Sequence, residues 1–395
     1  MPHFEPFPGL RFRDDVDLDA VTAPPYDVIP PAARAELAGR TAYNVVHVDL
    51  PDEAEGPDRY TNAAERLAQW EADGVLVRDS EPSFYVYRMG YHDRAGRPRQ
   101  TTGVVGALGL VPPFDGVLPH ERTTPKAKTD RLELLRATST NLSPIWGLSL
   151  AEGLADLCEP TGPPLGRATD EAGVHHRFWP VRSPALVEAI TERVSSAPVV
   201  IADGHHRWET SIAYRDERGG GPGAADLTLA LVVELAPDQL DVRPIHRLLR
   251  GLPPGLDLLD ALSTWFEVLD TQPPDPSLPA RAEEVGALGL ALPGSEAVLL
   301  RPRAEAFPDE TPDLDASRLD VARAGLPEHE VVFEAETDAV LAEVGSGDAV
   351  GVFLRPATVA QIAATAHGDE RMPPKTTYFW PKPRTGFVFR PVDSP

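Results

Sequence analysis

The chain of 395 residues is 42% hydrophobic and 25% charged, the balance of a soluble globular protein with one large or two to three ordinary domains. Its formal net charge of −24 argues against nucleic acid or an anionic membrane as the main partner, because both would repel it. The single cysteine, Cys158, excludes an internal disulfide scaffold, and its apolar neighbours predict a packed or half-exposed thiol rather than a nucleophile. The N-terminus has no signal core and no run of 18 apolar residues occurs, so a cytoplasmic protein is expected.

Hydrophobic periodicity predicts both helices and strands along the whole chain. Residues 60–72 have the pattern of an amphipathic helix, and two β-rich runs around the polar segment 93–97 predict a hairpin. The run 45–48 is predicted as a strand, with His47 and Asp49 on its other face. In chain order we expect a helix at 32–37, a strand at 45–48, a helix at 60–72, strands at 84–91 and 101–110, a helix at 130–137, a strand at 199–202, a helix from 205, strands at 229–235, 297–300 and 349–354, a helix at 358–366 and a strand at 387–389. This mixture predicts an α+β fold with mixed sheets and helices.

Proline clusters at 253–254 and 273–279 indicate a domain boundary or a long exposed connection. We therefore expect a phosphate-binding region over residues 1–250 and a C-terminal region over residues 251–395. The cationic segment from Lys375 to Lys382 is expected to return to the cleft of the first region.

A second cationic segment lies between Arg122 and Arg136, where five cations occur in an otherwise acidic protein. Such a segment is either a solvated loop and helix face or a local anion pocket. Both interpretations stay open at this point.

The stretch 198–215 is the most informative in the chain. An apolar run predicts a short buried strand that breaks at Asp203-Gly204 and restarts as a helix. The turn presents unpaired N–H groups at a helix N-terminus, where anions bind. Gly204 permits close approach of the backbone to a ligand, and Arg207 supplies a forked, permanently charged donor. The pattern predicts a phosphate site.

The adjacent His205 and His206 have other interpretations. Two neighbouring histidines in a loop are also typical of a metal half-site, or of polar loop residues without a chemical role. The strand–turn–helix context favours the anion site.

Several sequence blocks, in one order, resemble the bacterial family known as domain of unknown function 1015. The family name implies no activity. The blocks lie at residues 24–29, 120–123, 130–141, 141–145, 202–207, 243–247 and 372–377.

The Asp-Gly-His-His-Arg block also resembles the phosphate-binding motif of a wider group, which contains ParB-type partition CTPases, sulfiredoxin and free-serine kinases. This resemblance implies a ParB/sulfiredoxin-like core in which Arg207 holds nucleotide phosphates. In the kinases an acidic residue near the N-terminus of the domain is the general base, which implies Asp27 here. Asp27 could instead simply cap the helix expected to begin near Pro30. Sulfiredoxin chemistry needs a cysteine in the motif, where this chain has His205.

The leading hypothesis is a small-molecule kinase that transfers phosphate to a hydroxyl acceptor, for which the resemblance implies free serine. The donor would be ATP, ADP or pyrophosphate, with Mg²⁺ as cofactor. Asp203 would hold the metal or fix a histidine tautomer. The candidate residues are Asp27 and His206 for catalysis; Asp203, Gly204, His205, His206, Arg207, Lys126, Lys128, Arg131 and Lys375 for phosphate or nucleotide; and Tyr26, Asn141, Ser143, Arg243 and His246 for the substrate.

Two other functions remain open. A nucleotide-binding regulatory module would share the phosphate site but need no acceptor pocket. A metal-dependent phosphohydrolase would use Asp203, His205, His206 and His246, whose spacing matches no metal signature. The acidic charge and the lack of a basic helix-turn-helix block disfavour a DNA-partition role.

Overall fold

The computed structural model describes residues 1–112, 115–119, 128–220, 223–294, 296–368 and 372–392. It has the expected α+β architecture with mixed sheets. The chain forms two compact units: unit 1 contains Met1–Asp241 and Pro381–Pro395, and unit 2 contains Val242–Trp380. This division differs from the one expected at residue 250, because the two proline clusters lie in connections inside unit 2 rather than between the units.

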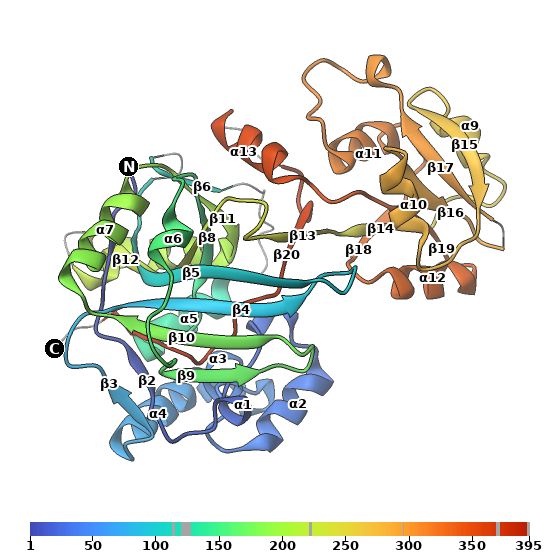
Figure 1. Cartoon of the computed structure of the whole chain (residues 1–395). Helices are drawn as coiled ribbons and strands as arrows, with labels where there is room; N and C mark the ends of the chain where they lie inside the picture. The colour runs from blue at the N-terminus through green and yellow to red at the C-terminus, as the bar shows by residue number, and fades with distance from the viewer. Residues whose placement is uncertain (113–114, 120–127, 221–222, 295, 369–371, 393–395) are drawn as a thin grey trace. The chain divides into compact units, whose positions relative to one another are not determined.

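Unit 1 is built around a nine-stranded mixed sheet (Figure 1). Its strands are β1 (Phe4–Glu5), β4 (Phe84–His92), β5 (Pro98–Gly109), β6 (Val117–Pro119), β8 (Ile145–Ser149), β9 (Gly166–Thr169), β10 (His175–Val181), β11 (Val199–Asp203) and β12 (Leu227–Glu234). They run in the order β6-β11-β8-β12-β5-β4-β10-β9, with β1 paired to β5. The predicted hairpin is β4–β5, in register from Tyr85↔Val105 to His92↔Pro98.

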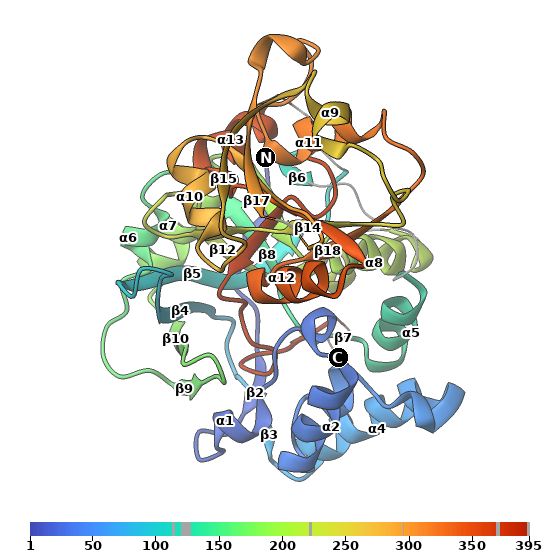
Figure 2. The ribbon, with the colours of Figure 1, turned by 90° about the vertical axis from the view of Figure 1, so that its right-hand side faces the viewer.

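Helices and short elements surround this sheet. The helical elements of unit 1 are α1 (Leu18–Val21), η1 (Tyr26–Val28), α2 (Pro31–Arg40), α3 (Val46–Asp49), η2 (Glu53–Asp58), α4 (Arg59–Ala72), α5 (Lys128–Thr138), α6 (Leu154–Leu157), α7 (Pro184–Ser195), α8 (His205–Glu217) and η4 (Ala224–Asp226). Two small ladders pair β2 (Leu10–Phe12) with β3 (Leu76–Arg78) and β7 (Thr140–Asn141) with β21 (Arg390–Pro391). Figure 2 shows α4, α5 and α8 side by side, as their contacts require.

The apolar core of unit 1 forms where α6 and α7 pack on the sheet. Ile190 and Val194 of α7, fully buried, pack against sheet residues such as Val199 and Ile201. Cys158 belongs to the same cluster, so of the two predicted environments, packed or half-exposed, the structure has the packed one, and burial raises the pKa of the thiol to about 12.

The expectation for residues 45–48 is wrong. The segment forms the short helix α3, whose Val46, Val48 and Asp49 are all buried. A run of five residues is too short for its periodicity to separate a strand from a buried helical turn. The helix turns Asp49 inward rather than to an opposite, exposed face.

Unit 2 is a sheet covered by helices on both faces. The order β15-β17-β16-β19-β14-β18 makes six strands, and β13 pairs with β20 beside them. Buried residues of α9 and α11 form one apolar cluster with the sheet, and those of α10 and α12 form another. The elements are β13 (Asp241–Pro244), β14 (His246–Arg250), α9 (Leu258–Leu262), β15 (Phe266–Gln272), α10 (Leu278–Glu284), β16 (Leu288–Ala291), β17 (Ala297–Pro302), η5 (Ala304–Ala306), α11 (Asp315–Arg323), β18 (Glu330–Glu334), α12 (Thr337–Ser346), β19 (Ala349–Phe353), α13 (Val359–His367) and β20 (Thr377–Trp380).

After unit 2 the chain re-enters unit 1 as an extended segment. Thr385 bridges Ala23, Phe389 bridges Leu10, and the buried Arg384 donates to Thr22. The expected strand at 387–389 is thus an isolated bridge at Phe389 followed by β21. Within the described residues, no helix has the length and apolar character needed to cross a bilayer.

Candidate functional site

The predicted strand–turn–helix around Gly204 is present. Strand β11 ends at Asp203, Gly204 adopts the left-handed conformation with φ +86°, and α8 begins at His205. A Cβ at position 204 would stand 3.0 Å from the Arg207 guanidinium. Both the backbone angle and this close approach therefore favour glycine.

Arg207 and Lys382 share Asp203 as a counter-ion. The Arg207 Nη2 atom lies 2.7 Å from one Asp203 oxygen, and the Lys382 Nζ lies 2.5 Å from the other. Arg207 Nη1 donates to the carbonyl of Pro144. Burial alone would raise the pKa of Asp203, but the positive charges of Lys382 and Arg207 outweigh it and hold the pKa well below its usual range. Asp203 is a fixed anion that positions two cations.

This pairing makes Asp203 a poor ready-made metal ligand, because each of its oxygens already faces a cation. In the part of the chain that the structure describes, no group of three or more His, Cys, Asp or Glu side chains could hold a metal ion. The residues do not fit a preformed magnesium site. We derive no chemical step through a metal.

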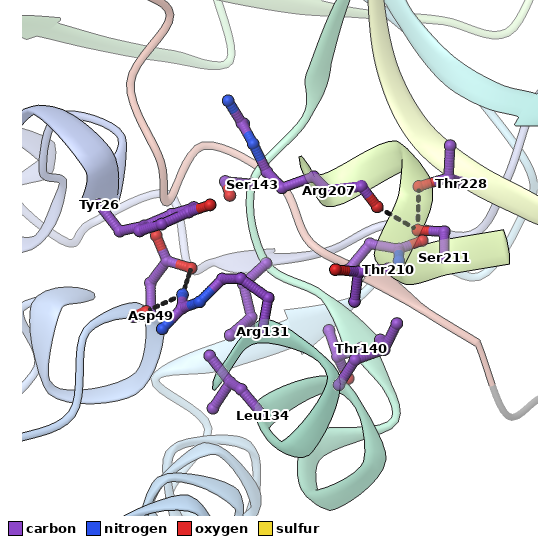
Figure 3. Close-up of a pocket in the computed structure, with 13 residues that line it drawn as sticks. Tyr26, Asp49, Arg131, Leu134, Thr140, Ser143, Arg207, Thr210, Ser211 and Thr228 are labelled. Carbon is purple, nitrogen blue, oxygen red and sulfur yellow. Dashed lines mark hydrogen bonds and ion pairs between the residues drawn. The ribbon is translucent and has the colours of Figure 1, made fainter. Parts of the chain in front are cut away.

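A cavity of about 50 Å³ lies beside Arg207 (Figure 3). Its walls come from η1, α3, α5, the segment from β7 to Ser143, α8 and β12. The lining is rich in hydroxyl and amide groups, which belong to Thr140, Asn141, Ser143, Thr210, Ser211 and Thr228. Two buried atoms of its lining residues, Arg207 Nε and Thr210 Oγ1, have no hydrogen-bond partner.

Tyr26 lies in this wall against two guanidinium groups. The Cζ atom of Arg131 is 4.1 Å from the centre of its ring, and that of Arg207 is 6.0 Å away. Burial raises the pKa of Tyr26 to about 12. Its hydroxyl group is therefore a neutral donor at physiological pH.

Arg131, which lines the cavity, lies between Asp130 and Asp49 and contacts both. Its Nε and Nη2 lie 2.8 and 2.6 Å from one oxygen of Asp130, and Nη1 donates to the Asp49 carbonyl at 2.5 Å. The Asp49 carboxylate is looser, with its nearest oxygen 3.6 Å from Nη1. Burial raises the pKa of Asp49, although Arg131 and Arg207 oppose the shift.

Asp27 lies in η1 and is exposed. The described structure rules out the capping alternative, since the N-cap of α2 is Pro30 and no side chain caps it. The charge of Asp27 acts on Tyr26, Asp49 and Arg207. Asp27 is therefore at the same end of unit 1 as the cavity.

The other predicted residues that precede unit 2 lie in α8, in the cavity lining, and at or just before α5. His205 and His206 lie, partly buried, in the first turn of α8, and Asn141 and Ser143 line the cavity. Lys126 lies outside the described residues, and Lys128 begins α5 in a position whose side chain is not described.

The remaining predicted residues belong to unit 2. Lys375 is exposed in a turn with φ +59°, and Arg243 stacks on Trp380 with its Cζ 3.8 Å from the ring centre. His246, expected to bind substrate, is fully buried against Phe353 in unit 2, and its Nδ1 accepts from the backbone N–H of Leu354 at 3.2 Å. That expectation is corrected: the environment of His246 is a packed interior, produced by its place in the inner strand β14, between β19 and β18.

Sequence reasoning missed Asp49 and the hydroxyl groups of α8 and β12. The available signal for Asp49 was a single carboxylate at the end of a valine-rich buried run. Thr210 and Ser211 follow Arg207 by three and four positions, a spacing that puts them on its face of a helix. The sequence analysis included Lys382 only as the last residue of the cationic segment 375–382 and did not predict its pairing with Asp203.

The fold and this cavity define an α+β protein with a small, charged and hydroxyl-lined pocket in its larger unit. The chain belongs to the family described as "Protein of unknown function (DUF1015)", whose model matches residues 4–322. No curated protein matches the chain.

Solved structures show a distant likeness in fold. A free serine kinase mutant in complex with ADP is 14% identical, with a TM-score of 0.41 over 74% of this chain and 92% of that chain. SbnI with a C-terminal truncation, from Staphylococcus aureus, is 13% identical, with a TM-score of 0.41 over 73% and 87%. A conserved hypothetical protein from Pyrococcus furiosus is 16% identical, with a TM-score of 0.37 over 72% and 93%.

Proposed function

We propose that the protein binds the phosphates of a nucleotide or of pyrophosphate beside Arg207 and transfers a phosphoryl group to a small hydroxyl-bearing acceptor such as free serine. One observation carries the proposal. Arg207, in the first turn of α8, is only 9% exposed, lines a cavity and keeps a buried Nε–H without a hydrogen-bond partner. A buried donor left without a partner costs free energy, so an anionic ligand that accepts from it is favoured.

The surroundings of Arg207 suit phosphoryl transfer, which depends mainly on positioning and on stabilisation of negative charge. Asp203 and the Pro144 carbonyl fix the guanidinium, and Lys382 adds a second cation. The first-turn N–H groups of α8 add a positive partial charge. These groups are preorganised, because their partners hold them before a ligand arrives.

The size of the cavity limits what enters it. A volume of about 50 Å³ corresponds to roughly three to five water molecules at about 10–15 Å³ each. A phosphoryl group or the end of a small acceptor fits this space, and an adenosine moiety does not. In the proposal, the base and ribose of a nucleotide donor stay outside the cavity.

Mg²⁺ enters the proposal as a companion of the phosphates. In phosphoryl-transfer sites it keeps several waters and binds through substrate phosphates with one or two carboxylates. It would neutralise phosphate charge there. The chain's own contribution in this proposal is the binding and orientation of phosphate by Arg207, Lys382 and α8.

Isothermal titration calorimetry with ATP, ADP, AMP and pyrophosphate, with and without Mg²⁺, tests the binding step. We expect at least one of these ligands to bind, and Arg207→Met to weaken its binding at least tenfold, about 1.4 kcal/mol. Arg88→Met is the matched control, because Arg88 is half-buried in unit 1 but pairs with Glu159, away from the cavity lining. If the wild-type protein binds none of the four, the proposal is wrong.

Mass spectrometry of a hydroxyl-acceptor panel, L-serine included, tests the transfer step. A phosphorylated product that depends on Arg207 supports the kinase. Ligand binding without transfer to any acceptor would instead favour the nucleotide-binding regulatory module. The metal-dependent phosphohydrolase has no support from the described residues, since His246 is buried in unit 2 and no metal-ligating cluster is found among them.

A further inference from the structure

We propose that the cavity beside Arg207 is the acceptor subsite, that it takes a compact polar hydroxyl compound, and that Asp49 rather than Asp27 accepts the hydroxyl proton. This inference rests on the proposed phosphoryl transfer. It assigns catalytic work to a residue that the sequence pattern did not single out.

The state of the Asp49 carboxylate is the first argument. Its side chain is only 6% exposed and lies in the cavity wall, yet its nearest cation atom, Arg131 Nη1, is 3.6 Å away. The Nε and Nη2 groups of Arg131 both donate to Asp130. The carboxylate oxygens of Asp49 can therefore still accept a hydrogen bond from a ligand, whereas each oxygen of Asp203 already lies next to a cation.

Proton affinity is the second argument. A general base works best when its pKa lies close to the operating pH. Burial raises the pKa of Asp49 toward that range. Lys382 and Arg207 instead lower the pKa of Asp203, away from it. Asp27 is exposed, so water competes for its carboxylate.

The polar lining is the third argument, and it indicates the acceptor class. Figure 3 shows Tyr26 and Asp49 on one side of the cavity and Thr210, Ser211 and Thr228 on the other. Ser211 and Thr228 hydrogen-bond to each other at 3.0 Å, whereas Thr210 Oγ1 is buried without a partner. A ligand that reaches from Asp49 toward Thr210 satisfies both groups. The small volume of about 50 Å³ and the hydroxyl-rich lining favour a compact polar hydroxyl compound over an aromatic or long-chain alcohol.

In the transfer step the acceptor oxygen forms a bond to the terminal phosphorus of the donor while the bond from that phosphorus to its bridging oxygen breaks. The leaving group departs with the electron pair of the broken bond. The hydroxyl proton moves to the Asp49 carboxylate and later to solvent. Arg207 Nε donates to the transferred phosphoryl group, so proton acceptance and charge stabilisation come from different side chains.

Charged and polar groups from four segments face Asp49 and set its titration. Arg131 of α5 and Arg207 of α8 lower its pKa, the charge of Asp27 in η1 raises it, and the Thr385 hydroxyl of the C-terminal segment lowers it. Because the base must be ionised, activity falls as the pH drops through the raised pKa of Asp49. The acid limb of kcat against pH should therefore lie above the range of an ordinary aspartate.

Matched aspartate variants test this assignment. With ADP or ATP as donor and L-serine as acceptor, we expect Asp49→Asn to lower kcat at least 100-fold, the lower range for a positioned acid–base group, while the donor Kd changes less than twofold. The acid limb should disappear in Asp49→Asn and persist in Asp27→Asn, whose loss of kcat should be smaller. Asp79→Asn is the control, since Asp79 is equally buried in unit 1 but bonds to Tyr85 and Arg11.

A readout without turnover separates this inference from the proposed function. Thr210→Val removes a hydroxyl at nearly constant volume, and we expect it and Asp49→Asn each to weaken L-serine binding at least fivefold, measured by titration in the presence of AMP, which has no phosphoanhydride bond to break. Full transfer by Asp49→Asn, or serine binding unchanged in both variants, overturns the inference and leaves the kinase standing. Absence of transfer by the wild-type protein to any acceptor overturns both.

Discussion

The two units bury charge in different ways. In unit 2 two buried charged residues pair within the unit: both carboxylate oxygens of Asp315 bind the Arg355 side chain, and Arg247 donates to the Ile245 carbonyl and packs on Phe333. Apolar clusters fill both faces of the unit 2 sheet.

In unit 1 the cavity wall holds buried groups that the protein leaves partly unsatisfied. Arg207 Nε and Thr210 Oγ1 lack partners there, and the nearest oxygen of the Asp49 carboxylate lies 3.6 Å from Arg131 Nη1. Single unpartnered atoms also occur elsewhere, at Arg66 and Thr385 in unit 1 and at Arg281, Ser317 and His329 in unit 2, but those of Arg207 and Thr210 belong to lining residues of the same cavity. Unsatisfied buried polar groups destabilise a fold, so their concentration in one place indicates a ligand. We therefore place the ligand site in unit 1.

Removing one buried arginine from each unit should change ligand binding more strongly than any other substitution below changes stability. Arg207→Met should weaken donor binding about 100-fold, roughly 2.7 kcal/mol, because a charge-assisted contact to phosphate is lost. Arg247→Met in unit 2 should lower the melting temperature and leave the donor Kd unchanged. Calorimetric titration of both variants with ADP measures this, and equal losses in the two variants would remove the distinction between the units.

The next effect concerns Asp203 and stability. Its pKa is lower in the folded protein than in the unfolded chain, so its ionisation stabilises the fold above about pH 4, and this contribution is lost as the pH falls further. We expect Asp203→Asn to lower the free energy of unfolding at pH 7 by about 2 kcal/mol, because Arg207 and Lys382 lose a charged hydrogen-bond partner. Urea unfolding at pH 7 and at pH 3 checks the sign: the gap between variant and wild type should shrink at the lower pH, and a constant gap would contradict it.

The ionisation of Asp49 should have the opposite effect on stability to that of Asp203. Its pKa is raised on folding, so ionisation of Asp49 opposes folding at neutral pH. Asp49→Asn should therefore increase the free energy of unfolding at pH 7 by about 1 kcal/mol, as often occurs when a functional group is neutralised. The gain should vanish below about pH 4, where the carboxyl is protonated in both states. A destabilised variant at pH 7 would show that Asp49 serves packing instead.

The smallest effect is at Cys158. With its pKa raised to about 12 by burial, almost no thiolate exists at pH 8, and the thiol should not react with a disulfide reagent while the protein is folded. Reaction should begin only with unfolding of unit 1. Rapid labelling of the native protein would show that the α6 region opens locally.

The sequence predicted what short-range patterns encode. Around Gly204, the apolar run, the left-handed turn and the helix follow from neighbouring residues, and the β4–β5 hairpin follows from two runs about one polar segment. The same local reasoning failed for Asp49, since a five-residue run carries too little periodicity to separate a strand from a helical turn.

The sequence pattern could not predict ion pairs between residues far apart in the chain. Lys382 pairs with Asp203 across 179 positions only because the chain leaves unit 1 after Asp241, builds unit 2 and returns at Pro381. Proline clusters could not reveal this arrangement, as they occur in loops within a unit as well as between units.

A crystal structure of the protein with ADP would show whether the site beside Arg207 holds phosphate. We predict a phosphate oxygen within hydrogen-bond distance of Arg207 Nε, at the start of α8, with the adenine outside the hydroxyl-lined cavity. ADP bound to unit 2, or bound in unit 1 with Arg207 Nε still without a partner, would contradict the account.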